Sequence, residues 1–275
     1  MIKDIVVQLT GSDQDSVRIA YARQIGELFE AHVTGLQVHV LPELIAITDP
    51  VASTYLQTLL AESHARAQKV TDALAGQFDT MTVPHELRRL DVYPSTVGKT
   101  LAAEARTADL FVGTRPYGGA GGEERIEEEV LFKSGRGCLL VPPGGTPPGR
   151  YETIFVAWNN TREAARAVAE ALPFLEQATQ VIVGLVEEEG ASEQFGIEPG
   201  TDIGRYLSRH GVAAEIRPIN GWVYAGEALL NEAQRTGSQM IVMGGYGHSR
   251  FREWVLGGAT RHLLTHANVP VLMAH

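Results

Sequence analysis

The stretch Ser238–His275 reads SQMIVMGGYGHSRFREWVLGGATRHLLTHANVPVLMAH. It opens with the short apolar run Met240–Met243, which has the length of a buried strand. Phe251–His266 then shows the apolar spacing of a helix, and Val269–Ala274 is a second apolar run. The order of strand, glycine-rich loop, helix and strand is typical of an α/β fold with a parallel sheet.

Three glycines in this stretch fall at Gly244, Gly247 and Gly257, a G-x2-G-x9-G spacing. Glycine takes backbone conformations that other residues avoid, and it lets a ligand approach the main chain. Successive N–H groups in such a loop attract anions, and the start of a helix adds partial positive charge. The spacing fits a phosphate-binding loop, and it fits a tight strand-to-helix connection without a ligand equally well.

Outward from this stretch, the chain alternates strands and helices. In the N-terminal half we expect strands at Ile5–Leu9, His32–Val40, Val83–Leu90, Leu110–Gly113 and Gly137–Pro142, and helices at Val17–Phe29, Tyr55–Phe78, Ser95–Arg106 and Glu124–Lys133. In the C-terminal half we expect strands at Thr153–Trp158 and Gln180–Val186 and helices at Arg162–Leu175 and Pro199–Arg209 before the stretch quoted above. The N-terminal half therefore predicts a five-stranded parallel sheet with helices on both faces, and the repeat described next supplies the fifth strand of the C-terminal half.

The second half repeats the first. SQMIVMGGYG echoes ADLFVGTRPYG, and AAEIRPINGWVYAGEALLNEA echoes PHELRRLDVYPSTVGKTLAAEA. Between the halves, Pro142–Arg150 reads PPGGTPPGR, a composition typical of a linker. We predict two domains, residues 1–143 and 150–275, joined by a linker at residues 144–149.

Composition limits the functional classes. The chain has 275 residues, 44% hydrophobic and 20% charged, with a net charge of -10. This charge argues against a surface for nucleic acid or anionic membrane, and no apolar run reaches the ~18 residues of a membrane span. The single cysteine, Cys138, excludes an internal disulfide, and its apolar neighbours predict an inert core thiol. With no signal peptide at the N-terminus, we expect a cytoplasmic protein.

The glycine spacing, the preceding Met243 and the terminal VPVLM run resemble the universal stress protein family. The resemblance extends over nearly the whole chain as a tandem, two-domain member. It implies two Rossmann-like (adenine nucleotide alpha hydrolase-like) domains with strand order 3-2-1-4-5. It also implies that the fifth strands, Cys138–Val141 and Val269–Met273, pair within the chain. The result would be an intramolecular pseudo-dimer, either alone or paired again as a homodimer.

In this family, G-x2-G-x9-G followed by Ser or Thr marks the members that bind ATP. The resemblance implies that the C-terminal domain binds ATP or another adenine nucleotide, alone or with Mg²⁺. The implied binding residues are Ala157, Trp158, Asn159, Val186, Met243, Gly244, Gly247, His248, Gly257, Gly258, Ala259 and Thr260. Two positions depart from the pattern, because Gly258 replaces the usual Ser or Thr and Asn159 replaces the usual Asp. Trp158 and Val186 each fit a packing role as well as a place beside the base.

The N-terminal domain lacks the signature. Counted from Gly113, the second glycine position is Pro116, which has no N–H, and the third falls near Arg125 in an acidic stretch. We predict that this domain binds no nucleotide and acts as a structural or regulatory partner.

Three functions stay open at this stage. The first is a stress-response protein that binds an adenine nucleotide as a sensor or regulator. The second is a scaffold of the same fold that binds a protein or another small ligand, and the third is a weak ATPase. We name no catalytic residue, since no general base is aimed at the γ-phosphate. We also name no metal ligand, although His262 and His266 are four residues apart, a spacing that suits zinc.

Overall fold

The computed structural model describes residues 1–42, 50–116, 126–186, 200–245 and 258–275. The N-terminal half contains β1 (Asp4–Leu9), α1 (Gln14–Phe29), β2 (His32–Val40), α2 (Pro50–Phe78), β3 (His85–Val92), η1 (Pro94–Thr96), α3 (Val97–Ala105), β4 (Leu110–Thr114), α4 (Ile126–Ser134) and β5 (Gly137–Val141). The C-terminal half contains β6 (Thr153–Ala157), α5 (Arg162–Leu175), β7 (Gln180–Val186), α6 (Thr201–Arg209), β8 (Ala214–Ile219), α7 (Ala225–Arg235), β9 (Met240–Gly244), α9 (Ala259–His266) and β10 (Val271–Ala274).

The elements follow the predicted order, and most boundaries agree within a few residues. The largest difference is in α2, which begins at Pro50 instead of Tyr55. Of the last predicted helix, Phe251–His266, the structure describes only Ala259 onward. The domain division at residues 144–149 stays a prediction.

All ten strands form one continuous sheet in the order β3-β2-β1-β4-β5-β10-β9-β6-β7-β8. Read from its outer edge toward the centre, each half has the predicted order 3-2-1-4-5, and every pairing within a half is parallel. The two halves meet at β5 and β10, which pair antiparallel with Leu272 opposite Leu139. The predicted pairing of the fifth strands is confirmed. It protects two apolar sheet edges that would otherwise be open to another chain.

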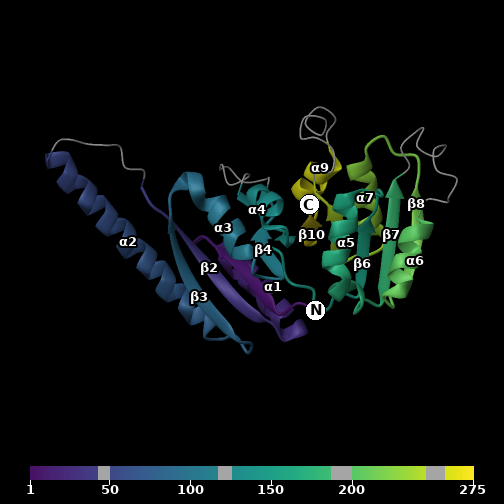
Figure 1. Ribbon diagram of the computed structural model, residues 1–275, viewed down its shortest axis with the longest axis horizontal. Helices are drawn as coiled ribbons and strands as arrows, with labels where there is room; N and C mark the ends of the chain where they lie inside the picture. Colours follow the sequence, from purple (N-terminus) through teal and green to yellow (C-terminus); the bar gives the residue numbers. More distant parts are fainter. Residues whose placement is uncertain (43–49, 117–125, 187–199, 246–257) are drawn as a thin grey trace.

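Helices lie against the sheet in both halves (Figure 1). Buried apolar side chains from the two halves belong to one core cluster. The rings of Phe29 in α1 and Phe174 in α5 lie perpendicular with their centroids 5.0 Å apart. Tyr151, just after the proline-rich segment, packs edge-on against Phe174 at 5.4 Å. The halves are therefore joined by aromatic packing as well as by strand pairing.

The proline-rich segment is held against α1. Tyr21 donates its hydroxyl to the carbonyl of Thr146 at 3.1 Å, and Gln24 donates to the carbonyl of Pro148 at 3.0 Å. Burial raises the pKa of Tyr21 to about 12, so this hydroxyl keeps its proton and its donor role. These two hydrogen bonds hold the proline-rich segment in one position against α1. Its composition alone predicts only that no helix or strand forms there.

The internal repeat extends to side-chain contacts. Arg88 at β3 pairs with Glu104 of α3, and Arg217 at β8 pairs with Glu232 of α7. Gly98 and Gly226 occupy equivalent places at the starts of α3 and α7, where each lets the next helix of its half approach closely. These shared contacts show that the two sequence echoes fold into the same frame.

Cys138 lies in the central strand β5 and is fully buried. Burial raises the pKa of its thiol to about 12, which agrees with the expected unreactive core residue.

Within the residues described, no helix combines the length and the apolar character that a membrane span requires.

Candidate functional site

The strand order reverses direction at β6. The chain leaves β6 for β7 and β8 on one side, and then returns to β9 on the other. Ala157, the last residue of β6, lies beside Met243 near the end of β9. Crevices beyond the carboxyl ends of strands at such a reversal are where open α/β sheets bind ligands.

One wall of this crevice is the start of α5. Thr161 caps the helix, because its Oγ1 accepts a hydrogen bond from the backbone N–H of Ala164 at 3.3 Å. The same hydroxyl donates to Oδ1 of Asn159 at 2.9 Å, and Asn160 between them has a left-handed φ of 53°. Asn159 is exposed, so its amide group remains available to a ligand.

Gly244, the first glycine of the signature, has a packing role. A Cβ at this position would lie 2.5 Å from the backbone nitrogen of Ala164 and 2.6 Å from the backbone carbon of Glu163. The end of β9 therefore lies directly against the first turn of α5. The absence of a side chain at Gly244 is required by the fold before any ligand is considered.

The other wall is α9, which follows the glycine-rich loop. Gly258 is its N-cap residue, with φ -44° and ψ 142°, and no side chain caps the helix. Gly226 of α7 lets this end of α9 approach, since a Cβ there would lie 3.0 Å from Cα of Ala259. The first N–H groups of α9 thus lack the side-chain oxygen that Ser or Thr at position 258 would supply.

Arg162, Glu163 and His275 form a polar group where the start of α5 meets the end of β9. Arg162 pairs with Glu163, whose residue surface is only 5% exposed, and its Nη2 lies 3.3 Å from Nε2 of His275. His275 contacts the carbonyl of Gly245 through Nδ1 at 2.9 Å. Burial alone would raise the pKa of Glu163, but hydrogen bonds from Arg162 and the backbone, with nearby positive charge, lower it. Sequence reasoning missed this group, because His275 lies 113 positions along the chain from Arg162.

The predicted binding residues divide into two sets. Ala157, Trp158, Asn159, Val186, Met243, Gly244, Gly258, Ala259 and Thr260 lie within the described residues, at strand ends or at the start of α9. Gly247, His248 and Gly257 lie outside them. Trp158 packs against the core, and its backbone N–H donates to the carbonyl of Gly184 at 3.0 Å. Thr260 is only 3% exposed, so its hydroxyl faces the protein more than the solvent.

The equivalent crevice of the N-terminal half is filled by its own side chains. Asp15 accepts hydrogen bonds from the N–H groups of Thr10 and Gly11 at 2.9 and 2.7 Å, and it forms a buried ion pair with Arg18. Arg18 also donates to the hydroxyls of Thr10 and Thr114 at 2.8 and 3.2 Å. This network links the end of β1 to the end of β4 through Arg18, which contacts Thr10 and Thr114.

The strand pairing also corrects the alignment of the two halves. Arg115 donates its N–H to Val141 at the end of β5, as Gly245 donates to Ala274 at the end of β10, both at 2.9 Å. Thr114 is therefore the counterpart of Gly244, and the assignment of Gly113 to that position was wrong by one residue. The corrected register still provides no glycine at the first position of the signature.

Arg115 links the N-terminal half to α9. Its Nη1 donates to the carbonyl of Leu264 at 2.6 Å and also to the carbonyl of Thr265. These carbonyls belong to the last turn of α9, where the helix dipole favours a positive charge. Desolvation lowers the pKa of Arg115 from its usual value, yet an arginine stays protonated at neutral pH. The helix beside the candidate site is thus stabilised from the other half of the chain.

His262 and His266 stack within α9, with ring centroids 4.4 Å apart and an interplanar angle of 28°. His266 Nδ1 contacts the carbonyl of His262 at 2.9 Å. Burial, followed by the charge of His266, lowers the pKa of His262. The pair packs as neighbouring rings on one helix face.

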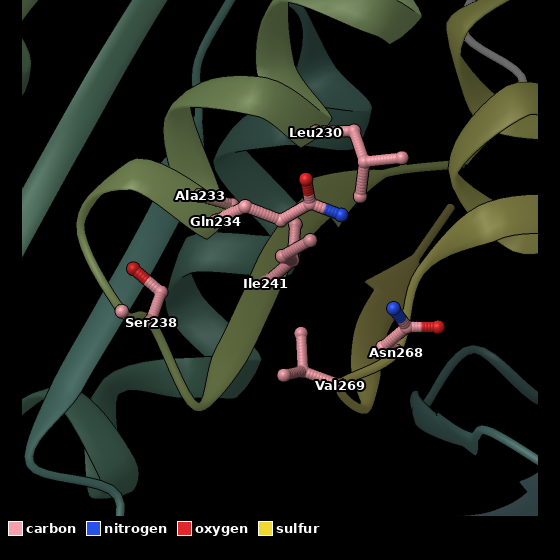
Figure 2. Close-up of a pocket in the computed structure, with 8 residues that line it drawn as sticks. Leu230, Ala233, Gln234, Ser238, Ile241, Asn268 and Val269 are labelled. Carbon is pink, nitrogen blue, oxygen red and sulfur yellow. The ribbon is translucent and has the colours of Figure 1, made fainter.

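A cavity of about 230 Å³ lies at the opposite end of the C-terminal half. It is lined by residues at the end of α7 and at the starts of β9 and β10, including Ser238, Ile241 and Asn268 (Figure 2). Its position at the amino ends of the strands separates it from the crevice at their carboxyl ends.

One protein-family model matches the C-terminal half of the chain. It is the model of the universal stress protein family, and it matches residues 150–275. The C-terminal half belongs to the universal stress protein family. Because the N-terminal half repeats its fold, the chain has the arrangement of a tandem universal stress protein. No curated protein matches the sequence.

Solved structures show the same fold over the full length. A universal stress protein from Archaeoglobus fulgidus DSM 4304 is 15% identical, with a TM-score of 0.73 over 98% of this chain and 97% of that one. A structure assigned to the same family from Pseudomonas aeruginosa UCBPP-PA14 is 14% identical, with a TM-score of 0.58 over 99% and 93%. These matches confirm that two such folds in one chain form a known architecture.

Proposed function

We propose that the C-terminal domain of this universal stress protein binds an adenine nucleotide, ATP with or without Mg²⁺, in the crevice between β6, β9 and α9. The observation that carries the proposal is the meeting of two features at one place. The strand order reverses between β6 and β9, and the glycine-rich loop of the family signature leaves β9 at that edge. The division into domains at residues 144–149 belongs to the same proposal.

The start of α9 suits the phosphates of a nucleotide, and the ends of β6 and β7 suit its ribose and base. Within the described part of the chain, no side chain caps the first N–H groups of α9, which leaves them to donate to phosphate oxygens. Asn159 and Val186 stand at the ends of β6 and β7 and offer a polar and an apolar contact for the ribose and the base. Gly244 keeps the strand end close to α5, which brings the walls together.

We infer a binding and regulatory role with slow hydrolysis or none. Phosphoryl transfer depends on a positioned nucleophile and on stabilisation of the developing charge. Glu163, the buried carboxylate nearest the crevice, is paired with Arg162 and has a lowered pKa, which makes it a poor general base. Turnover by the wild type at a rate of ~1 s⁻¹ or faster, the range of kinases, would contradict this part of the proposal.

The test uses the missing hydroxyl. Gly258 has the extended backbone of an N-cap residue, which Ser adopts without strain. Gly258→Ser restores the hydroxyl at the family position, and Gly258→Ala adds the same Cβ without it. Isothermal titration with Mg·ATP is then expected to show binding by the wild type and tighter binding, by about tenfold, in Gly258→Ser only, the scale of one hydrogen bond to a charged group.

Three outcomes decide the proposal. Binding that strengthens in the serine variant and not in the alanine variant supports a phosphate at the start of α9. Equal affinity in all three proteins would place the nucleotide elsewhere and overturn the site. No heat and no change in melting temperature with millimolar Mg·ATP, in the wild type and in Gly258→Ser alike, would overturn binding itself and favour a scaffold function.

A further inference from the structure

Two histidines and an aspartate meet at the outer edge of the N-terminal domain. His39 of β2 lies opposite Asp91 of β3 in the parallel register, so their side chains point to the same face. His39 Nδ1 is 2.8 Å from Oδ1 of Asp91, and Nδ1 of His64, on α2, is 4.0 Å from Oδ2 of the same carboxylate. One donor atom from each residue lies within 4.8 Å of the other two.

We propose that His39, His64 and Asp91 bind one Zn²⁺ ion, with solvent as the fourth ligand. Two imidazole nitrogens and one carboxylate oxygen form a donor set that zinc binds tetrahedrally, with bonds of about 2.0–2.2 Å. Three protein ligands with an open fourth position are typical of sites that bind or activate a small molecule. No sequence motif indicates this site, because its three ligands come from three separate elements, β2, α2 and β3.

Binding requires the donor atoms, which lie within 4.8 Å of one another, to rearrange: His64 moves toward Asp91, and the 2.8 Å hydrogen bond between His39 and Asp91 opens. Bonds of that length place tetrahedral donor atoms about 3.3 Å apart, compared with the 4.0 Å between His64 and Asp91. His64 has a side chain that is 45% exposed, so it is free to move toward the carboxylate. Its exposure, with the 34% exposure of Asp91, also gives the ion a path from solvent.

Ser63 provides the supporting contact that metal-bound histidines usually have. Its Oγ lies 2.8 Å from Nε2 of His39, and both residues are buried. When Nδ1 of His39 binds the ion, Nε2 carries the proton and donates it to Ser63. Such a partner fixes the tautomer and the orientation of the ring.

Arg89 opposes the ion and sets a limit on affinity. Its Nε lies 3.1 Å from Oδ1 of Asp91, and its Nη2 lies 3.3 Å from Oδ2. The guanidinium competes for the carboxylate and repels a cation. Gln68 accepts a hydrogen bond from Nη1 of Arg89 at 3.3 Å, which gives the side chain an alternative partner when the ion binds.

The same residues form a chain from Ser63 through His39 to Asp91, the connectivity of a serine hydrolase. Ser63 is only 7% exposed and lies in the middle of the long helix α2, so a substrate has no access to its hydroxyl. A nucleophile also requires donors aimed at the developing oxyanion, and the backbone N–H groups within a helix are already used. The metal site also accounts for the position of His64 beside Asp91, a residue that has no part in the Ser63–His39–Asp91 series of hydrogen bonds.

The test is a zinc titration of the full-length chain after treatment with a chelator. Isothermal titration is expected to give one Zn²⁺ per chain, and Co²⁺ substitution is expected to give the visible absorption of a tetrahedral site. His64→Ala and Asp91→Asn should each weaken binding by at least about tenfold, since each removes one ligand of three. His266→Ala is the matched control, because it removes an exposed histidine from the pair on α9.

A second variant keeps the proposal falsifiable if Asp91→Asn disturbs folding. Arg89→Gln removes the competing charge and is expected to bind Zn²⁺ about tenfold more tightly than the wild type. Weaker or unchanged binding in Arg89→Gln would contradict the assigned carboxylate. Unchanged binding in His64→Ala, or an equal loss in His266→Ala, would show adventitious binding to surface histidines and overturn the site.

Discussion

Replacing Arg115 by alanine tests whether the N-terminal half stabilises α9. The change removes one hydrogen bond of 2.6 Å to Leu264 and a second bond to Thr265, both at the negative end of the helix. Hydrogen bonds from charged donors contribute about 1.5–3 kcal/mol, and water reaching the freed carbonyls recovers part of this. We expect a loss of about 2 kcal/mol in the free energy of unfolding, or about 5 °C in melting temperature.

The assay is thermal unfolding followed by circular dichroism, with two comparisons. Arg136→Ala is the matched control, since this half-buried arginine donates to the carbonyl of Arg106 within its own half. Arg115→Lys retains the charge with a single donor group, and we expect about half of the loss. A melting temperature of Arg115→Ala within 1 °C of the wild type (about 0.3–0.5 kcal/mol), or equal to that of Arg136→Ala, would refute the coupling.

Two further changes test packing and charge. Gly244→Ala should lower the free energy of unfolding by about 2–3 kcal/mol, because the new Cβ overlaps the backbone at the start of α5. Gly76→Ala is the control, since it has open space in α2 and should stabilise the protein slightly. Equal stability of the two variants in thermal unfolding would contradict the close approach at Gly244. Glu232→Gln tests the pH dependence, since hydrogen bonds and charge from Arg235 and Arg217 lower the pKa of Glu232 from 4.5 to about 2. Its contribution is complete above the unfolded value of 4.5 and is lost as pH falls toward 2, so urea unfolding should separate the variant from the wild type at pH 7 and not near pH 2.

The fold follows closely from sequence because its signals are local. Period and length identify the strands, the proline-rich segment marks the break, and the echo between halves supplies the second copy. The resemblance to a known family adds strand order and the pairing of the fifth strands, both of which the structure confirms. The start of α2 is predicted less closely. The helix begins at Pro50, and its first residues, PVAS, show no helical spacing of apolar residues that would mark them in the sequence. Proline itself is favoured at the first position of a helix.

The candidate site follows less closely because its contacts are not local. Arg115 and the end of α9 are about 150 positions apart in the chain, and no motif joins them. Gly244 matched a ligand-binding motif, yet the contact that requires it is with the backbone of α5. The Asp15–Arg18 pair that fills the N-terminal crevice is likewise visible only after β1 and β4 are placed side by side.

The two halves are equivalent in frame and different at one decisive position. Arg115 and Gly245 occupy the same place at the end of the fourth strand, and each faces the other half across β5 and β10. The arginine reaches the end of α9, whereas a Cβ at Gly245 would lie 2.7 Å from Leu131 of α4, so α4 instead packs onto bare backbone. The N-terminal half therefore stabilises α9 through the charged side chain of Arg115. The C-terminal half contacts α4 at the equivalent position only through packing at Gly245. The N-terminal half, which lacks the glycine signature, thereby stabilises the helix beside the proposed site.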